Sequence, residues 1–407
     1  SRMGEQIEFD TEGTVTSAKG YLAGGTFAGL KTPGEGVLDL GILVSESPAS
    51  VAGTYSTNKI LSPSVTVTQE KAADATARGV VANSGCANCA VGPQGFSDAK
   101  DLSTLAAGHA EVDEDSMLVS STGMIGVELP MALIRKAIPN VELTSEGGEA
   151  FARSIMTTDS RAKHASVSFE VDAVTYTIGG AAKGVGMIHP NMATMLCFLT
   201  TDADVEAGFL QNALSAAVDL SFNMIDVDGD QSTNDTVLLF SNGAAGGAQI
   251  TADSESAGVF QEALNQIAIH HAKELVRDGE GAERIFAVTV ERAASSADAR
   301  AGAREIASSN LVKAMVHGKD PNWGRLMMAL GKSGIELNEP NIDIFVNDIH
   351  IVHEGIAIPY YSDAVIAGMN VAEVQFRIAL NIGTGVATAW GCDLTEEYVT
   401  FNSAYST

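Results

Sequence analysis

Short apolar runs that end at turn residues predict strands along most of the chain. One run at residues 80–83 stops at Ser84-Gly85, and another at residues 117–120 stops just before Thr122-Gly123. Alternating apolar positions on both sides of Asn347-Asp348 predict a hairpin. Further strands are predicted at residues 195–199, 285–290 and 373–382.

Apolar positions three or four residues apart predict helices between these strands. Pro130 stands where the first turn of a helix tolerates proline. Asp204 is the expected N-cap of a helix that places Leu210 and Leu214 on one face. Gly279 is expected to end the longest helix. The three predicted helices occupy residues 131–136, a segment that follows Asp204, and residues 259–276.

Hairpins interspersed with helices favour an α+β fold with mixed α/β layers, in which mixed or antiparallel sheets have helices on their outer faces. The order of elements does not follow regular βαβ winding. The chain has 407 residues, enough for two or three domain-sized units. No low-complexity tract or Pro/Ser-rich linker marks a boundary between them.

Amino-acid composition says more about the classes of binding partner than about the fold. Hydrophobic residues make up 45% of the chain and charged residues 18%, which is typical of a compact globular protein. The net charge of -27 argues against nucleic acid and anionic membranes as partners. No apolar run approaches the length of a membrane span. Four cysteines do not make a disulfide framework. The first residues lack an apolar signal core, and those before Met3 look like a cloning remnant, so a cytoplasmic location is expected.

The segment with most chemical information is residues 183–196, where a glycine-rich run leads to Ala193, Thr194 and then an apolar strand. A threonine so placed can attack the carbonyl of the preceding residue and break the chain there. Its freed amino group, with an ordinary pKa of about 8, can act as the base for its own hydroxyl. A turn entering a strand, with no chemistry at all, is the alternative interpretation.

Residues 183–196 resemble the signature of the ornithine acetyltransferase family (glutamate N-acetyltransferase, of arginine biosynthesis). Residues 78–88, 228–236 and 317–325 resemble further family motifs in the same order. The resemblance implies autocatalytic cleavage between Ala193 and Thr194, with Thr194 as the residue that carries the acetyl group.

The resemblance also implies a four-layer αββα sandwich in the larger unit and a smaller α/β unit. Cleavage would give an α chain of residues 1–193 and a β chain of residues 194–407. The cut would fall inside the fold and not at a domain boundary, so the two pieces should stay associated. The family pattern implies an α2β2 heterotetramer.

Acyl transfer needs donors for the oxyanion as well as a nucleophile. The strand-to-turn junction at Thr122-Gly123 can bring a hydroxyl and a backbone N–H together, and the resemblance places the oxyanion hole there. A carboxylate after a helix end, as at Glu280, opposes the helix dipole and invites a functional interpretation. The resemblance assigns substrate contacts to Thr157, Lys183, Thr194, Glu280, Asn402 and Thr407. Without it, these would pass for a solvated lysine, two turns and a frayed C-terminus.

The expected reaction is ping-pong transfer of acetyl from N2-acetylornithine to glutamate through acetyl-Thr194, with no metal or organic cofactor. Ornithine and N-acetylglutamate are the products. Some family members also accept acetyl-CoA, and the sequence leaves open whether this chain does. A related self-processing hydrolase or peptidase is the alternative enzyme, and an uncleaved binding protein is the non-enzymatic alternative.

Several other motifs are weaker. Cys86 and Cys89 form a single C-x-x-C, which could be redox-active or half of a zinc site, but no second pair accompanies it. The acidic run at residues 226–230 lacks the glycine and glutamate of a calcium loop. His270-His271 fall within a predicted helix, where a core or surface histidine is the commoner case. Gly184 and Gly186 lack the context of a dinucleotide site.

Overall fold

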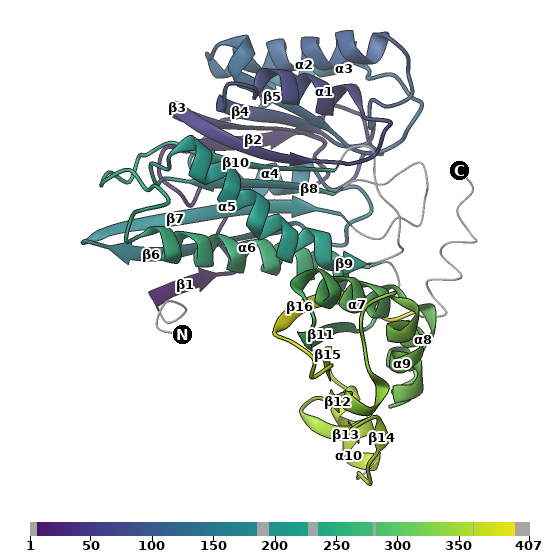
Figure 1. Cartoon of the computed structure of the whole chain (residues 1–407). Helices are drawn as coiled ribbons and strands as arrows, with labels where there is room; N and C mark the ends of the chain where they lie inside the picture. The colour runs from purple at the N-terminus through teal and green to yellow at the C-terminus, as the bar shows by residue number, and fades with distance from the viewer. Residues whose placement is uncertain (1–5, 185–194, 227–234, 280–281, 361, 395–407) are drawn as a thin grey trace. The chain divides into compact units, whose positions relative to one another are not determined.

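The computed structural model describes residues 6–184, 195–226, 235–279, 282–360 and 362–394. The chain divides into two compact units, each with a sheet of its own (Figure 1). The larger comprises Ser1–Val218 and Asp230–His271, and the smaller comprises Asp219–Gly229 and Ala272–Thr407. None of the described helices is long and apolar enough to cross a membrane.

A nine-stranded mixed sheet forms the frame of the larger unit, in the order β1-β6-β7-β8-β10-β3-β4-β5, with β2 also paired to β3. The long strand β3 joins two parts of this sheet: its first half pairs with β2, and its second half pairs with β10. The strands are β1 (Ile7–Asp10), β2 (Tyr21–Thr26), β3 (Leu40–Tyr55), β4 (Thr76–Asn83), β5 (Met117–Ser121), β6 (Lys163–Val171), β7 (Val174–Lys183), β8 (Leu196–Thr201) and β10 (Thr236–Ser241).

Helices cover the two outer faces of this folded sheet (Figure 1). Successive residues of β4 face opposite ways, so Val80 lies in the core that contains Phe198 of β8, whereas Val81 lies in a core with Leu102 of α2. The helices are α1 (Pro63–Lys71), α2 (Gln94–Ala110), α3 (Met131–Ala137), α4 (Gly148–Ser154), α5 (Ala207–Leu220) and α6 (Ala257–Arg277). The layers are therefore helix, sheet, sheet and helix, with α4 contributing to the inner core.

The second helical layer packs on β6 through aromatic side chains. Phe169 of β6 meets Phe260 of α6 edge-on at 6.4 Å between ring centroids, and Phe260 also lies 6.1 Å from Phe209 of α5. Such contacts add to the burial of large apolar surface. Phe260, Leu264 and Ile267, which are spaced at helical intervals in the sequence, thus lie on the buried face of α6.

The smaller unit holds a seven-stranded mixed sheet in the order β14-β13-β12-β15-β11-β16-β9. Its strands are β9 (Ile225–Asp226), β11 (Ile285–Ala293), β12 (Asp343–Val346), β13 (Ile349–His353), β14 (Ile356–Ala357), β15 (Glu373–Ala379) and β16 (Gly385–Cys392). Its helices are α7 (Ser296–Ser308), α8 (Asn310–His317), α9 (Trp323–Lys332) and α10 (Ser362–Met369). Short 3-10 helices lie at Phe222–Met224 and Glu339–Asn341 in this unit, and at Glu114–Ser116 and Ile138–Asn140 in the larger unit.

The structure confirms the α+β, mixed α/β fold class and most of the predicted elements. The strands predicted at residues 80–83, 117–120, 195–199 and 285–290 correspond to β4, β5, β8 and β11. The predicted hairpin is β12 and β13, and its turn residues Asn347 and Asp348 both have positive φ, as a tight two-residue hairpin turn requires.

Two expectations about element ends are wrong. Asp204 does not cap α5, because the helix begins at Ala207 and the carboxylate of Glu206 accepts hydrogen bonds from Gly208 N and Phe209 N. The strand predicted to reach residue 382 ends at Ala379. The backbone turns away there, and Asn381 adopts a left-handed φ of 58°.

Candidate active site

A buried lysine bonds two other residues that the sequence assigned to the active site. Lys183 is the last residue of β7 and is 1% exposed. Its Nζ donates to Thr122 Oγ1 at 3.0 Å and to Thr157 Oγ1 at 2.9 Å. Thr122 follows β5, and Thr157 follows α4, so three separate segments meet at one ammonium group.

Strand pairing places this lysine beside the start of β8, the strand that follows the predicted cleavage segment in the sequence. Lys183 lies opposite Leu196 in the antiparallel ladder of β7 and β8, and Leu196 is two residues after Thr194 in the chain. The chain immediately before Leu196 is held at Met195, whose N–H donates to Asp235 Oδ1 at 2.8 Å and whose carbonyl accepts from Thr236 N at 3.1 Å. The entry to β8 therefore has a defined position next to Lys183.

The turn after Thr122 can be made only by glycine. Gly123 has a φ of +130°, which disfavours any residue with a side chain. A Cβ atom there would lie 2.4 Å from the carbonyl carbon of Gly85 and 2.5 Å from Cys86 N. Thr122 N donates to Asn83 O, whereas Gly123 N–H meets no acceptor among the residues with described positions. A backbone donor beside a threonine hydroxyl is the arrangement that an oxyanion hole needs.

The carboxylate of Asp159 organises the other side of the lysine. Its Oδ2 accepts from Lys163 Nζ at 2.6 Å and from Gly184 N at 3.0 Å, and its Oδ1 accepts from Thr157 N at 3.0 Å. Burial by itself would raise the pKa of this carboxyl, but the charges of Lys163 and Lys183 together with these hydrogen bonds lower it to about 2. Asp159 therefore stays ionised and fixes both Thr157 and the start of the glycine-rich run.

Burial gives Lys183 an unusual acidity for a lysine. Loss of hydration lowers its pKa to about 8, although Asp159 and Asp235 favour the charged form. A group with this pKa is charged at neutral pH and can lose its proton at modest cost. Buried lysines of this kind are typical of functional sites.

A second buried carboxylate shapes the loop that borders this cluster. Asp39 is fully buried and accepts four backbone N–H groups, those of Ala28, Gly29, Leu30 and Lys31. The loop in turn places Lys31, whose Nζ donates at 2.8 Å to the carbonyl of Met156, the residue just before Thr157. Desolvation lowers the pKa of Lys31.

The sequence interpretation identified residues at the centre of the cluster but missed the charged residues that hold them in position. Asp159 lies within the segment singled out for Thr157, and Lys163 follows it by four residues, so a paired charge was visible but had no role. Asp39 and Lys31 gave no local signal. The predicted residues that the structure describes, Thr122, Gly123, Thr157 and Lys183, lie together; Ala193, Thr194, Glu280, Asn402 and Thr407 lie outside the described residues.

The cysteine motif does not form a reactive thiol pair. The four cysteines are buried, and none of them forms a disulfide. Cys86 Sγ lies 3.0 Å from Val127 O, and burial raises the pKa of this thiol, so the nucleophilic thiolate is disfavoured. Residues 227–230 of the acidic run considered as a calcium loop lie outside the described residues.

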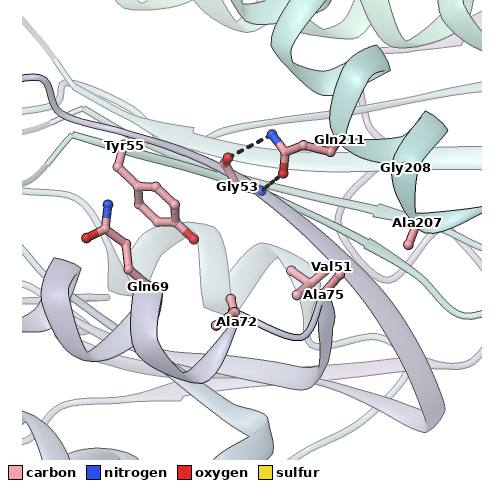
Figure 2. Close-up of a pocket in the computed structure, with 10 residues that line it drawn as sticks. Val51, Gly53, Tyr55, Gln69, Ala72, Ala75, Ala207, Gly208 and Gln211 are labelled. Atoms are coloured by element: carbon pink, nitrogen blue, oxygen red, sulfur yellow. Dashed lines mark hydrogen bonds between the residues drawn. The ribbon is translucent and has the colours of Figure 1, made fainter.

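A separate cavity of about 350 Å³ lies between α1, β3 and α5 in the larger unit (Figure 2). Tyr55 and Gln69 stand at one end, and Gln211 makes a pair of hydrogen bonds with the backbone of Gly53. Small side chains such as Ala72 and Ala75 line the rest. This cavity shares no lining residue with the lysine cluster, and none of its lining residues is charged.

Comparison with known proteins gives the family. The model of the ArgJ family matches residues 22–407. The chain is 42% identical to the arginine biosynthesis bifunctional protein ArgJ of Dehalococcoides mccartyi over 100% of both chains, and 45% identical to that of Symbiobacterium thermophilum over 97% and 99%. A crystal structure of ArgJ from Bacillus halodurans matches with a TM-score of 0.50 and 39% identity, covering 51% of this chain and 98% of that one. The chain therefore belongs to the ArgJ family of arginine biosynthesis, which confirms the family that residues 183–196 predict.

Proposed function

We propose that this chain is a glutamate N-acetyltransferase that takes acetyl from N2-acetylornithine. The observation that carries the proposal is the bonding of Lys183 to both Thr122 and Thr157, because it gathers the residues expected to serve acyl transfer. The family membership supports the same reaction, since its relatives are named for arginine biosynthesis.

The proposed chemistry starts with cleavage of the bond between Ala193 and Thr194, which frees the amino group of Thr194. That amine accepts the hydroxyl proton while Oγ attacks the acetyl carbonyl of N2-acetylornithine. The C–N bond then breaks, the proton passes to the leaving amine, and ornithine departs. The amine of glutamate attacks the acetyl-Thr194 ester and leaves as N-acetylglutamate, which restores the hydroxyl.

The described residues supply electrostatic support for these steps. Thr122 Oγ1 and the Gly123 N–H are the proposed donors to the tetrahedral oxyanion. Lys183 orients both threonine hydroxyls and contributes positive charge at the point where negative charge develops. Thr157 and Lys183 are also proposed to contact substrate, together with Glu280, Asn402 and Thr407, on the strength of the family resemblance alone.

We further propose that the mature protein consists of residues 1–193 and 194–407, paired as an α2β2 heterotetramer in the cytoplasm. The Bacillus halodurans ArgJ chain supports the division, because 98% of it is matched by only 51% of this chain. A relative whose solved chain has half this length is what cleavage near the middle would produce. The tetramer is carried over from the family resemblance, and the location is the expectation stated from the sequence.

Intact mass spectrometry of the purified protein tests the cleavage. Wild-type protein should give two fragments that divide at Thr194, whereas Thr194→Ala should give one full-length species without acetyl transfer. Thr175→Ala, at an exposed position of β7, is the matched control and should be cleaved and active. A single 407-residue species in active wild-type protein would overturn the mechanism.

Product analysis separates transfer from hydrolysis. With N2-acetylornithine and glutamate supplied together, the proposal expects N-acetylglutamate in equal amount to ornithine. Release of free acetate instead would identify a hydrolase, the alternative activity. A parallel reaction with acetyl-CoA and glutamate decides whether the chain accepts a second acetyl donor.

A pair of glycine variants tests the oxyanion hole. Gly123→Ala drives a Cβ into Gly85 and Cys86 and should lower kcat by about 10²-fold or more, the usual consequence of losing one such donor. Gly126→Ala is the control, since this nearby glycine also has positive φ but open space around its Cβ position. Equal losses in both variants would mean that backbone strain alone, and not the donor, explains the effect.

A further inference from the structure

Two histidines and an aspartate converge on one face of the β12–β13 hairpin in the smaller unit. His353 Nδ1 lies 2.9 Å from Asp343 Oδ1, and His350 Nε2 lies 3.6 Å from the same oxygen. The three potential ligand atoms lie within 4.8 Å of one another. These residues take no part in the acetyl-transfer site described above.

A β-bulge creates this arrangement. Residues three apart on a regular strand point to opposite faces of the sheet. In β13, however, the pairing shifts by one residue: Ile344 lies opposite Val352, but the next residue, Phe345, lies opposite His350. The extra residue, Ile351, turns His350 onto the same face as His353 and Asp343.

The side chains are held in place before any ion arrives. The ring of His350 stacks on Phe345, with 4.3 Å between centroids and an interplanar angle of 16°. Its Nε2 is buried and has no hydrogen-bond partner within the described parts of the chain. A buried ring nitrogen without a partner is costly unless something else satisfies it. A metal ion is the kind of partner that would do so.

Hydrogen bonds around the cluster resemble the outer shell of a metal site. Asp343 Oδ2 accepts from Asn381 Nδ2 at 3.1 Å, and Oδ1 accepts from Glu354 N at 3.0 Å. His353 Nε2 lies 3.5 Å from the carboxylate of Glu354, so one ring nitrogen faces a carboxylate while the other faces the cluster. Metal-bound histidines commonly have such a carboxylate partner on the second nitrogen.

The spacing suits a small tetrahedral ion. Bonds of about 2.0–2.1 Å from Zn²⁺ to nitrogen and oxygen place neighbouring ligand atoms roughly 3.3 Å apart. Two observed separations, 2.9 and 3.6 Å, lie on either side of that value, and the third, between the two histidine nitrogens, is at most 4.8 Å. Binding would require the side chains to adjust to equal spacing. We propose that Asp343, His350 and His353 bind one divalent transition-metal ion of the zinc type, with a fourth position open to water. The ion would cross-link β12 and β13.

A second group, Glu283, His317 and Asp393, fits this role less well. It offers a single histidine beside two carboxylates, whereas the hairpin group offers two histidines and one carboxylate. Two imidazoles and one carboxylate match the ligand preference of zinc, whereas one imidazole with two carboxylates matches it poorly. The second group therefore serves as the comparison site in the experiment.

Calorimetric titration of the chelator-treated full-length protein with ZnCl2 tests the proposal. Wild-type protein should bind one equivalent at the hairpin, and the double variant His350→Ala/His353→Ala should lose that equivalent. His317→Ala is the matched control and should keep it. The double variant must match the metal-free wild type in Tm, so that lost binding cannot come from unfolding.

Two further measurements keep the result decisive. Asp343→Asn, which preserves side-chain size, should weaken binding at least ten-fold, and it replaces the double variant if that protein fails to fold. Addition of ZnCl2 should raise the Tm of wild-type protein but not of either hairpin variant. The proposal is overturned if wild-type protein binds no Zn²⁺ below millimolar concentration, or if the hairpin variants retain the wild-type number of equivalents.

Discussion

The two units each contain a carboxylate flanked by two basic side chains, and burial makes them chemically different. In the larger unit, Asp159 stands between Lys163 and Lys183 with all three side chains almost completely removed from solvent. In the smaller unit, Asp343 stands between His350 and His353, whose side chains are 32% and 51% exposed. Similar charges thus occupy environments of very different polarity.

The difference teaches what burial does to a charged cluster. Desolvation strongly shifts the pKa of Lys183, and the charges inside hold one another in place because water does not screen them. Burial also acts to raise the pKa of Asp343, but hydrogen bonds from Glu354 N, His353 and Asn381 together lower it. The first cluster is therefore fixed and suited to catalysis, and the second is accessible and suited to an incoming ion.

The largest expected effect is on stability when Asp159 is lost. Asp159→Ala leaves two buried lysines without their counterion, which should cost about 3–5 kcal/mol in free energy of unfolding. Asp343→Ala, in metal-free protein, should cost only about 1 kcal/mol because both histidine side chains are partly exposed to water. Urea unfolding of both variants measures the contrast, and equal costs would break the distinction between the clusters.

A smaller effect is expected on catalysis when the two lysines beside Asp159 are compared. Lys183→Met removes the donor to Thr122 and Thr157 and should lower kcat about 10²–10³-fold with a small change in stability. Lys163→Met should chiefly lower stability, since it removes the buried ion pair with Asp159. Acetyl-transfer kinetics and urea unfolding midpoints of both variants test this difference. Equal effects on kcat and stability in the two variants would contradict the separate roles of the two lysines.

The pH dependence of activity should reflect the acidity of Lys183. Deprotonation of the Thr194 amine, with an ordinary pKa of about 8, should raise acetyl transfer as pH rises. The Lys183 pKa of about 8 predicts that its charged form is lost over the same range, which adds an alkaline decline. Lys183→Arg keeps its charge at every accessible pH, so its residual activity should not show this decline. A wild-type alkaline limb that persists unchanged in Lys183→Arg would assign the limb to another group.

The smallest expected effect is the loss of folding stability at low pH as Asp159 becomes protonated. The pKa of Asp159 falls from 3.8 to about 2 on folding, so its contribution is complete above pH 3.8 and is lost as pH falls through 2. The loss should be on the order of 2 kcal/mol. Asp159→Asn should flatten this part of the stability curve in acid-unfolding experiments. An unchanged slope would mean that other carboxyls dominate acid unfolding.

Local pattern was enough for many elements of this protein. Apolar runs and turn residues located β4, β5 and β8, because a strand needs alternating or continuous apolar positions whatever its neighbours are. Asn347-Asp348 identified the hairpin because few residues accept its backbone. The predicted N-cap of α5 was wrong because two acidic residues, Asp204 and Glu206, lie near the start of the helix. In the structure Glu206 accepts the N–H of Gly208, whereas Asp204 accepts a hydrogen bond from the distant Gln249 side chain.

By itself, the sequence determined the family, the residues of the proposed chemistry and the order of most strands and helices. Tertiary structure alone decided that Lys183 reaches Thr122, 61 residues away, and Thr157, 26 residues away. It also decided that a bulge turns His350 toward His353. The physical reason is the same in both cases: strand pairing between distant segments sets which side chains share a face and which lose their water, and no local pattern encodes that.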